Sequence, residues 1–137
     1  MITAALLITA LLFGGMILYS FGFAAFLFTA LPPETAGPTI RRAFPHFYLF
    51  VMGTATLAAI LTWPLASPLS LALGAIAITV LPTRQVLMPA INRATDAGAK
   101  STFKWLHGLS VLITLSHIGI TGWVLSQLPG LAIAASG

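Results

Sequence analysis

The chain contains no cysteine and very few charged residues. Among its 137 residues are six Lys and Arg and two Asp and Glu, so charged residues make up 6% of the sequence. The lack of cysteine excludes disulfides, thiolate metal ligands and thiol catalysis within this chain. So few charges cannot cover the surface of a water-soluble globular domain. We therefore expect a protein whose surface faces lipid.

The sequence also lacks the common motifs of hydrolases and nucleotide-binding enzymes. It has no glycine-rich phosphate loop, no His-Glu-x-x-His pattern and no Gly-x-Ser-x-Gly motif. Its two acids, Glu34 and Asp96, lie outside the apolar tracts, so paired carboxylates for acid–base catalysis are not expected. Enzymatic chemistry would need a bound cofactor, and the sequence favours a protein that is not an enzyme.

Long apolar tracts are what the sequence has instead. Hydrophobic residues make up 58% of the chain, and its mean hydropathy is +1.03. The uncharged tracts at residues 1–33, 43–83 and 105–137 each exceed the roughly 20 residues that cross a bilayer. The middle tract is long enough for two crossings.

A proline-rich segment divides the middle tract. Trp63, Pro64 and Pro68 lie close together at its centre. Tryptophan is common at membrane interfaces, and proline ends helices. We therefore predict an all-α fold, a four-helix transmembrane bundle that forms a single domain over residues 1–137. The predicted spans lie near residues 4–30, 44–63, 68–89 and 103–127.

The cations predict the orientation of the bundle. All six lie in or beside the two loops after the first and third spans: Arg41, Arg42, Arg84, Arg93, Lys100 and Lys104. By the positive-inside rule this face is cytoplasmic, so both termini are expected on the other side of a bacterial inner membrane. Six cations split between two short loops form no groove for nucleic acid. The expected partners are the lipid bilayer and either further copies of the chain or a larger membrane complex.

A polar stripe runs along the last predicted span. His107, Ser110, Thr114, His117 and Thr121 recur at steps of three and four, so they fall within an arc of about 80° on one helix face. Polar groups are costly in hydrocarbon, so they need protein partners, water or a ligand. The stripe therefore predicts a polar cleft along this helix. The alternative is that its members only form hydrogen bonds between helices, each contributing less than about 2 kcal/mol.

Two histidines suggest a second kind of site. His46 lies three residues beyond Ala43 and His107 three beyond Lys104, and both helices start from the cytoplasmic face, so the two imidazoles should lie at similar depth. If spans two and four are neighbours, the pair could ligate a metal ion or the iron of haem b from opposite sides. His107 and His117 with a further partner are another possible haem pair. Arg84 could extend to the interface or turn inward to hold an anion or a carbonyl.

Two short motifs resemble a known family. The run from Arg42 to Tyr48, Arg-Ala-Phe-Pro-His-Phe-Tyr, and the sequence His-Gly-Leu-Ser that begins at His107 are similar to the transmembrane protein 205-like family. The resemblance implies a small four-span membrane protein without an assigned function. Its animal relatives are associated with tolerance of platinum drugs, which implies metal or solute handling. An Asn expected in the third helix is replaced here by Pro82, with Asn92 further along.

Three functions are compatible with these features. The first is a non-enzymatic membrane protein that binds or handles a small solute or metal ion in a cleft along the fourth helix. The second is a haem b-binding redox protein with histidine ligands, and the third is an accessory subunit of a larger complex. The candidate site residues are His107, His46, His117, Ser110, Thr114 and Arg84, with His107 and His46 as the metal ligands if a metal is bound.

Overall fold

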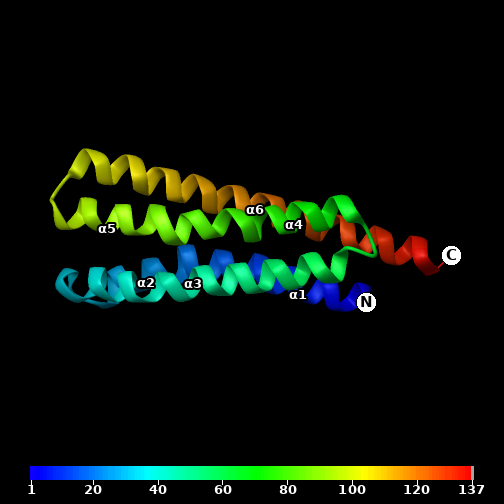
Figure 1. Cartoon of the computed structure of the whole chain (residues 1–137). Coiled ribbons are helices and arrows are strands. Elements are labelled where there is room, and N and C mark those ends of the chain that lie inside the picture. Colours follow the sequence, from blue (N-terminus) through cyan, green and yellow to red (C-terminus); the bar gives the residue numbers. More distant parts are fainter. Residues whose placement is uncertain (137) are drawn as a thin grey trace.

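The computed structural model describes residues 1–136, and it is helical throughout apart from short turns (Figure 1). The structure has six α-helical segments (α) and two π-helical segments (η). In chain order they are α1 Ile2–Ile17, η1 Leu18–Phe23, α2 Ala24–Ala30, α3 Pro33–Thr62, α4 Ser67–Pro82, η2 Thr83–Leu87, α5 Met88–Asp96 and α6 Lys100–Ser136. They form four continuous rods: α1–η1–α2, α3, α4–η2–α5, and α6. Each rod is long and apolar enough to cross a membrane, which confirms the prediction of an all-α four-helix membrane bundle.

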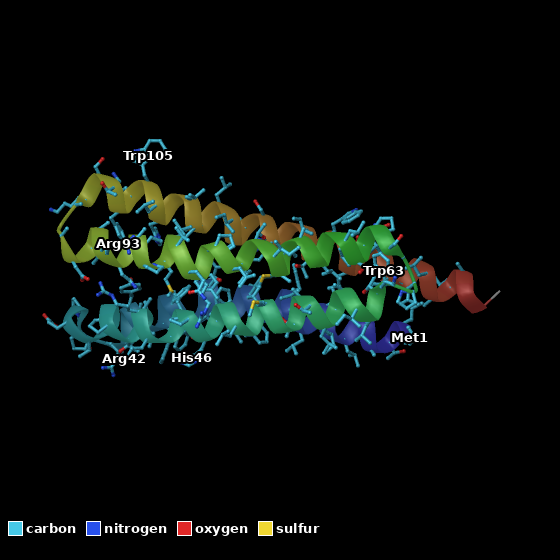
Figure 2. The ribbon with its side chains drawn as sticks, in the orientation of Figure 1. Met1, Arg42, His46, Trp63, Arg93 and Trp105 are labelled. Carbon is cyan, nitrogen blue, oxygen red and sulfur yellow. The ribbon has the colours of Figure 1, made fainter. Side chains whose placement is uncertain are left out.

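The four rods pack around a square. The first rod contacts α3 and α6, and the third rod contacts the same two, so α3 and α6 lie on a diagonal and form no extended interface. Both termini lie at one end of the bundle (Figure 1). The opposite end holds the turns at residues 31–32 and 97–99, and we call it the basic end because Arg42 and Arg93 lie near it (Figure 2).

The helices are longer than the predicted spans at the basic end. The segments that we expected to be loops around residues 34–43 and 90–102 are helical except for the short turn at 97–99. Pro33 is the first residue of α3, a position where the backbone N–H would have no helical partner in any case. Glu34 lies in the first turn, where its negative charge is stabilised by the positive end of the helix dipole. Pro38 and Pro45 lie inside α3, where each removes one backbone hydrogen bond and its ring crowds the carbonyl four residues earlier. The predicted break near Pro64 is confirmed, because α3 ends at Thr62 and α4 begins at Ser67.

Exposed tryptophans indicate where the bilayer lies. Trp105 is 80% exposed and Trp123 is 51% exposed. They are 18 positions apart on α6, or about 27 Å at 1.5 Å per residue, close to the roughly 30 Å of hydrocarbon that interfacial tryptophans flank. Trp63, which is also exposed, lies toward the terminal end of the bundle, opposite Trp105 (Figure 2). Thr114 is midway between Trp105 and Trp123, so it would lie near the centre of a bilayer whose two interfaces are at these tryptophans.

The tightest packing lies in the terminal half of the bundle. Side chains from all four rods are fully buried there, among them Leu12, Met16, Val51, Leu73, Ile76, Val80, Val124 and Leu128. This core seals the bundle between the bilayer centre and the terminal end. The basic half is more open, and the candidate site lies there.

Candidate functional site

A cavity of about 670 Å³ lies inside the basic half of the bundle. All four rods line it, and aromatic or aliphatic side chains make up most of its wall. The residues that line it include Ser20, Phe21, Phe28, Arg41, Phe44, Tyr48, Asn92, Asp96, Phe103, His107, Ser110 and Thr114. On α6 the lining runs from Phe103 to Thr114, about 16 Å along the axis. The cavity therefore extends from the interface marked by Trp105 to about the middle of the bilayer.

The polar stripe of α6 faces this cavity and the core beneath it. His107, Ser110 and Thr114 line the cavity, while His117 and Thr121 are buried. The Ser110 hydroxyl donates to the His107 carbonyl at 2.8 Å, and the Thr121 hydroxyl donates to the His117 carbonyl at 2.7 Å. These two hydroxyls are satisfied locally. The Thr114 hydroxyl has no hydrogen-bond partner among residues 1–136, so it is available to a molecule in the cavity.

His107 lies near the mouth of the cavity. Its ring stacks on Phe103, one turn earlier on α6, with ring centroids 5.4 Å apart and an angle of 7° between the planes. The stacking fixes the plane of the imidazole. Neither ring nitrogen forms a hydrogen bond to any described residue, so both can bind a solute or water.

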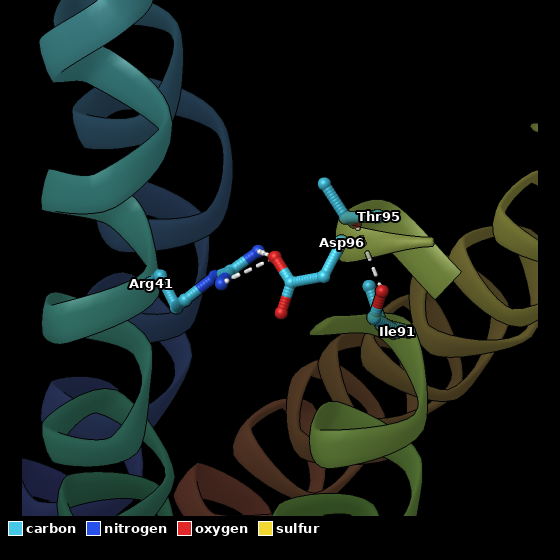
Figure 3. Close-up of polar contacts among 4 residues, drawn as sticks. All are labelled: Arg41, Ile91, Thr95 and Asp96. Carbon is cyan, nitrogen blue, oxygen red and sulfur yellow. Dashed lines mark hydrogen bonds and ion pairs between the residues drawn. The ribbon is translucent and has the colours of Figure 1, made fainter. Parts of the chain in front are cut away.

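An ion pair between two residues of the cavity lining joins two neighbouring rods (Figure 3). Both terminal nitrogens of Arg41 in α3 lie 2.9 Å from one carboxylate oxygen of Asp96, at the end of α5. The two side chains are 39% and 64% exposed, so water screens the attraction. Exposed pairs contribute about 0–1 kcal/mol, so this pair orients α3 relative to α5 more than it stabilises the bundle. Sequence reasoning missed the pair, although Asp96 was the single acid of its loop.

The first rod brings a buried hydroxyl to the cavity. Ser20 lies in η1, and its Oγ is buried without a hydrogen-bond partner among the described residues. Beside it, Tyr19 donates to the Ala43 carbonyl at 2.9 Å and stacks on Phe47 with centroids 5.0 Å apart. These contacts hold the rod against α3. The π-helical turn that presents Ser20 had no sequence signal, because a π-turn depends on the backbone's environment.

His46 and His107 do not lie together at one site. It is exposed on α3, it does not line the cavity, and its helix lies diagonally across the bundle from α6 (Figure 2). The two imidazoles lie in the same half of the membrane, but they do not form the opposed pair that a shared metal or haem would need. Within residues 1–136, no group of three His, Asp or Glu side chains is placed to hold a metal ion.

Arg84 turns inward rather than toward the interface. Its Nε donates to the Pro45 carbonyl of α3 at 3.4 Å, and the side chain is half-buried. This contact corresponds to the sequence-based alternative in which Arg84 holds a carbonyl. It lies outside the cavity lining and joins the third rod to α3.

His117 lies deeper, against the third rod. Its Nε2 is 2.9 Å from the Thr79 hydroxyl, which itself donates to the Ala75 carbonyl at 2.7 Å. In the tautomer with a hydrogen on Nε2, His117 donates to the Thr79 oxygen while the Thr79 hydroxyl donates to Ala75; in the other tautomer Nε2 accepts from Thr79. His117 is ten positions beyond His107, about 15 Å along α6, so the two imidazoles are too far apart to ligate one metal ion.

Comparison with known proteins identifies a family and no function. No curated protein and no solved structure matches the chain. One family matches residues 7–100, which is more than half of the chain and includes most of the first rod and all of the second and third. The residues of α6 that carry the polar stripe lie beyond the matched region. The chain belongs to the family defined by a domain of unknown function, DUF4149.

Proposed function

We propose that this protein binds a small amphipathic solute in the cavity at the basic end of its bundle, without catalysing a reaction. The observation that carries the proposal is the cavity itself, about 670 Å³ in volume and lined by all four rods. Ligand sites in proteins typically have volumes of about 300–1,000 Å³, with mainly apolar walls and a few polar groups that orient the ligand.

The polar groups are arranged to fix one end of a solute. His107, Ser110 and Thr114 follow one face of α6, with Ser20 and Asn92 from the first and third rods. Aromatic rings supply the remaining wall, so the solute needs an apolar body that carries a few hydrogen-bonding groups. The resemblance to the transmembrane protein 205-like family, with its implied solute handling, agrees with this proposal. A haem b function has no comparable support, because His46 lies outside the cavity.

Filling the cavity tests the proposal directly. We expect native mass spectrometry of the wild-type protein, released from mild detergent, to show a bound molecule of a few hundred daltons. In Ser110→Trp the indole would occupy the cavity, so occupancy should fall at least about tenfold, the result of losing roughly 1.4 kcal/mol or more of binding free energy.

Ser126→Trp is the matched control. Ser126 lies on the same helix, and its hydroxyl donates at 2.7 Å to the carbonyl three residues earlier, as that of Ser110 does at 2.8 Å. It is exposed and lines neither the cavity nor the groove of similar volume between the third rod and α6, so this variant should keep wild-type occupancy. Equal occupancy in the two tryptophan variants, or a wild-type protein that carries no adduct, would contradict the proposal. Circular dichroism of each variant reports whether the helices are retained.

We also propose that the cavity opens toward the cytoplasm, because the basic end carries the cations of the chain. The natural absence of cysteine allows a clean test with single-cysteine variants. Ala97→Cys lies in the turn at the basic end, and Ser67→Cys lies at the start of α4 near the opposite end. In intact spheroplasts an impermeant maleimide should label Ser67→Cys at once and Ala97→Cys only after the membrane is opened. The reverse pattern would show that the cavity opens outward.

A further inference from the structure

A small void lies directly beneath the cavity. Its volume is about 10 Å³, and its polar lining comes from Tyr48, Thr83, Thr114 and His117. Tyr48 and Thr114 line both the void and the cavity above it, so the two spaces are neighbours separated by these side chains. A void of roughly 10–15 Å³ is about the smallest that holds one water molecule, provided that two to four polar groups face it.

The hydroxyls around the void leave hydrogen-bonding capacity unused. The Thr83 hydroxyl donates to the Thr79 carbonyl at 2.8 Å, so its oxygen can still accept. The hydroxyls of Tyr48 and Thr114 form no hydrogen bond to any residue within 1–136, so each can donate.

His117 adds an acceptor. His117 lines the void, and its Nε2 is engaged with Thr79, which lies outside the void lining, so Nδ1 is the ring nitrogen without a partner among the described residues. In the tautomer with a hydrogen on Nε2 that nitrogen carries a lone pair. The void thus has two hydroxyl donors, Tyr48 and Thr114, and two acceptors, Thr83 Oγ and His117 Nδ1.

We infer that the void binds one water molecule, which connects the His117 imidazole to the cavity through the hydroxyls of Tyr48 and Thr114. The water accepts from one or both hydroxyls and donates to His117 Nδ1 and Thr83 Oγ, which satisfies the polar groups of the void. Such a water is enthalpically nearly as good as direct hydrogen bonds. It extends a continuous hydrogen-bonded path from the cavity to an imidazole just beyond the bilayer centre.

The path contains no ion pair. The residues that line the void include Met16 from α1, Tyr48 from α3, and Val80 and Thr83 from the third rod. None of its lining residues is a carboxylate or a cation, and the groove on the other side of His117, between the third rod and α6, is also without charged side chains. The nearest cation in sequence on the third rod, Arg84, bonds to the Pro45 carbonyl instead. The imidazole is therefore held by neutral groups, and water from the cavity is its link to the aqueous phase.

Water-edited NMR of the full chain in lipid bilayers, with ¹⁵N-labelled histidine, tests this inference without any solute. The His117 signal is assigned by its loss in His117→Gln. We expect magnetisation to pass from water to the His117 ring in the wild-type protein, and Nδ1 to show the shift of an unprotonated, hydrogen-bonded nitrogen. In Thr114→Val the transfer should fall to less than about half of the wild-type value, because valine keeps the shape of threonine and removes one of the two donors. Thr114→Ser restores a hydroxyl and should restore the transfer.

Thr121→Val is the control for a merely structural effect. The Thr121 hydroxyl bonds to the His117 carbonyl and does not line the void, so this variant should keep the transfer. Tyr48→Phe is a second test variant if Thr114→Val does not fold, and it should weaken the transfer. No transfer in the wild-type protein, or wild-type transfer in both Thr114→Val and Tyr48→Phe, would overturn the inference. Solute binding can fail in the mass-spectrometric test while this water remains, so the two proposals are separable.

Discussion

Replacing Ile76 by alanine is expected to lower the free energy of unfolding by about 1–2 kcal/mol, whereas Ile78→Ala should leave it almost unchanged. The two isoleucines lie two positions apart on α4, but Ile76 is 1% exposed in the core and Ile78 is 69% exposed. In a soluble protein the stability lost in Ile76→Ala would include the free energy of transferring apolar surface from water to the core. In a bilayer, lipid is as apolar as the core, so that contribution is nearly zero. What remains is the cavity, at about 24 cal/mol per Å³, and its lost dispersion contacts.

The measurement is unfolding in mixed micelles of mild detergent and sodium dodecyl sulfate, followed by circular dichroism. The same substitution at both positions cancels differences in helix propensity, so the gap between the variants reports packing alone. Equal stabilities would mean that α4 does not pack against its neighbours through Ile76. A gap of 3 kcal/mol or more would mean that burial from water, rather than packing, dominates this bundle.

The sequence was sufficient to predict features that depend on local composition. The four crossings follow from hydropathy over about 20 residues, and the break near Pro64 follows from the chemistry of proline. The common face of the polar stripe also follows locally, because helical periodicity assigns His107, Ser110 and Thr114 to one side of the helix, although it does not say which way that side points. The structure places that face on the cavity and the core.

The order of the helices around the bundle could not be predicted in this way. Placing α3 diagonally from α6 depends on contacts between distant segments, and the proposed pairing of His46 with His107 required those helices to be adjacent. The helical extension of α3 back to Pro33 was also missed, because prolines and arginines in one stretch favour a loop when only neighbouring residues are considered. Only the tertiary structure shows that the cavity is also lined by Ser20, Tyr48 and Asp96.

A second large effect is expected at the contact between the first rod and α3. A Cβ atom on Gly15 would lie 2.5 Å from both Cε1 and Cζ of Phe50, whereas a Cβ atom on Gly14 would meet nothing within 4 Å. Gly15→Val should therefore destabilise the bundle by about 1–3 kcal/mol more than Gly14→Val, because overpacking forces side chains and backbone to shift. The two variants carry the same intrinsic cost of valine in a helix, so their difference isolates the collision.

A double-mutant cycle identifies Phe50 as the cause. If its ring is the obstacle, Phe50→Ala should cost less in the Gly15→Val background than in the wild type, since truncation of the ring relieves the collision. Unfolding in mixed micelles measures all four proteins of the cycle. Additive costs would mean that the first rod moves as a unit away from α3. That movement would also disturb the stacking of Tyr19 on Phe47, one turn further along toward the cavity. Solute occupancy in Gly15→Val then distinguishes the two responses: a local adjustment of Phe50 leaves the cavity intact, and a displaced rod opens it.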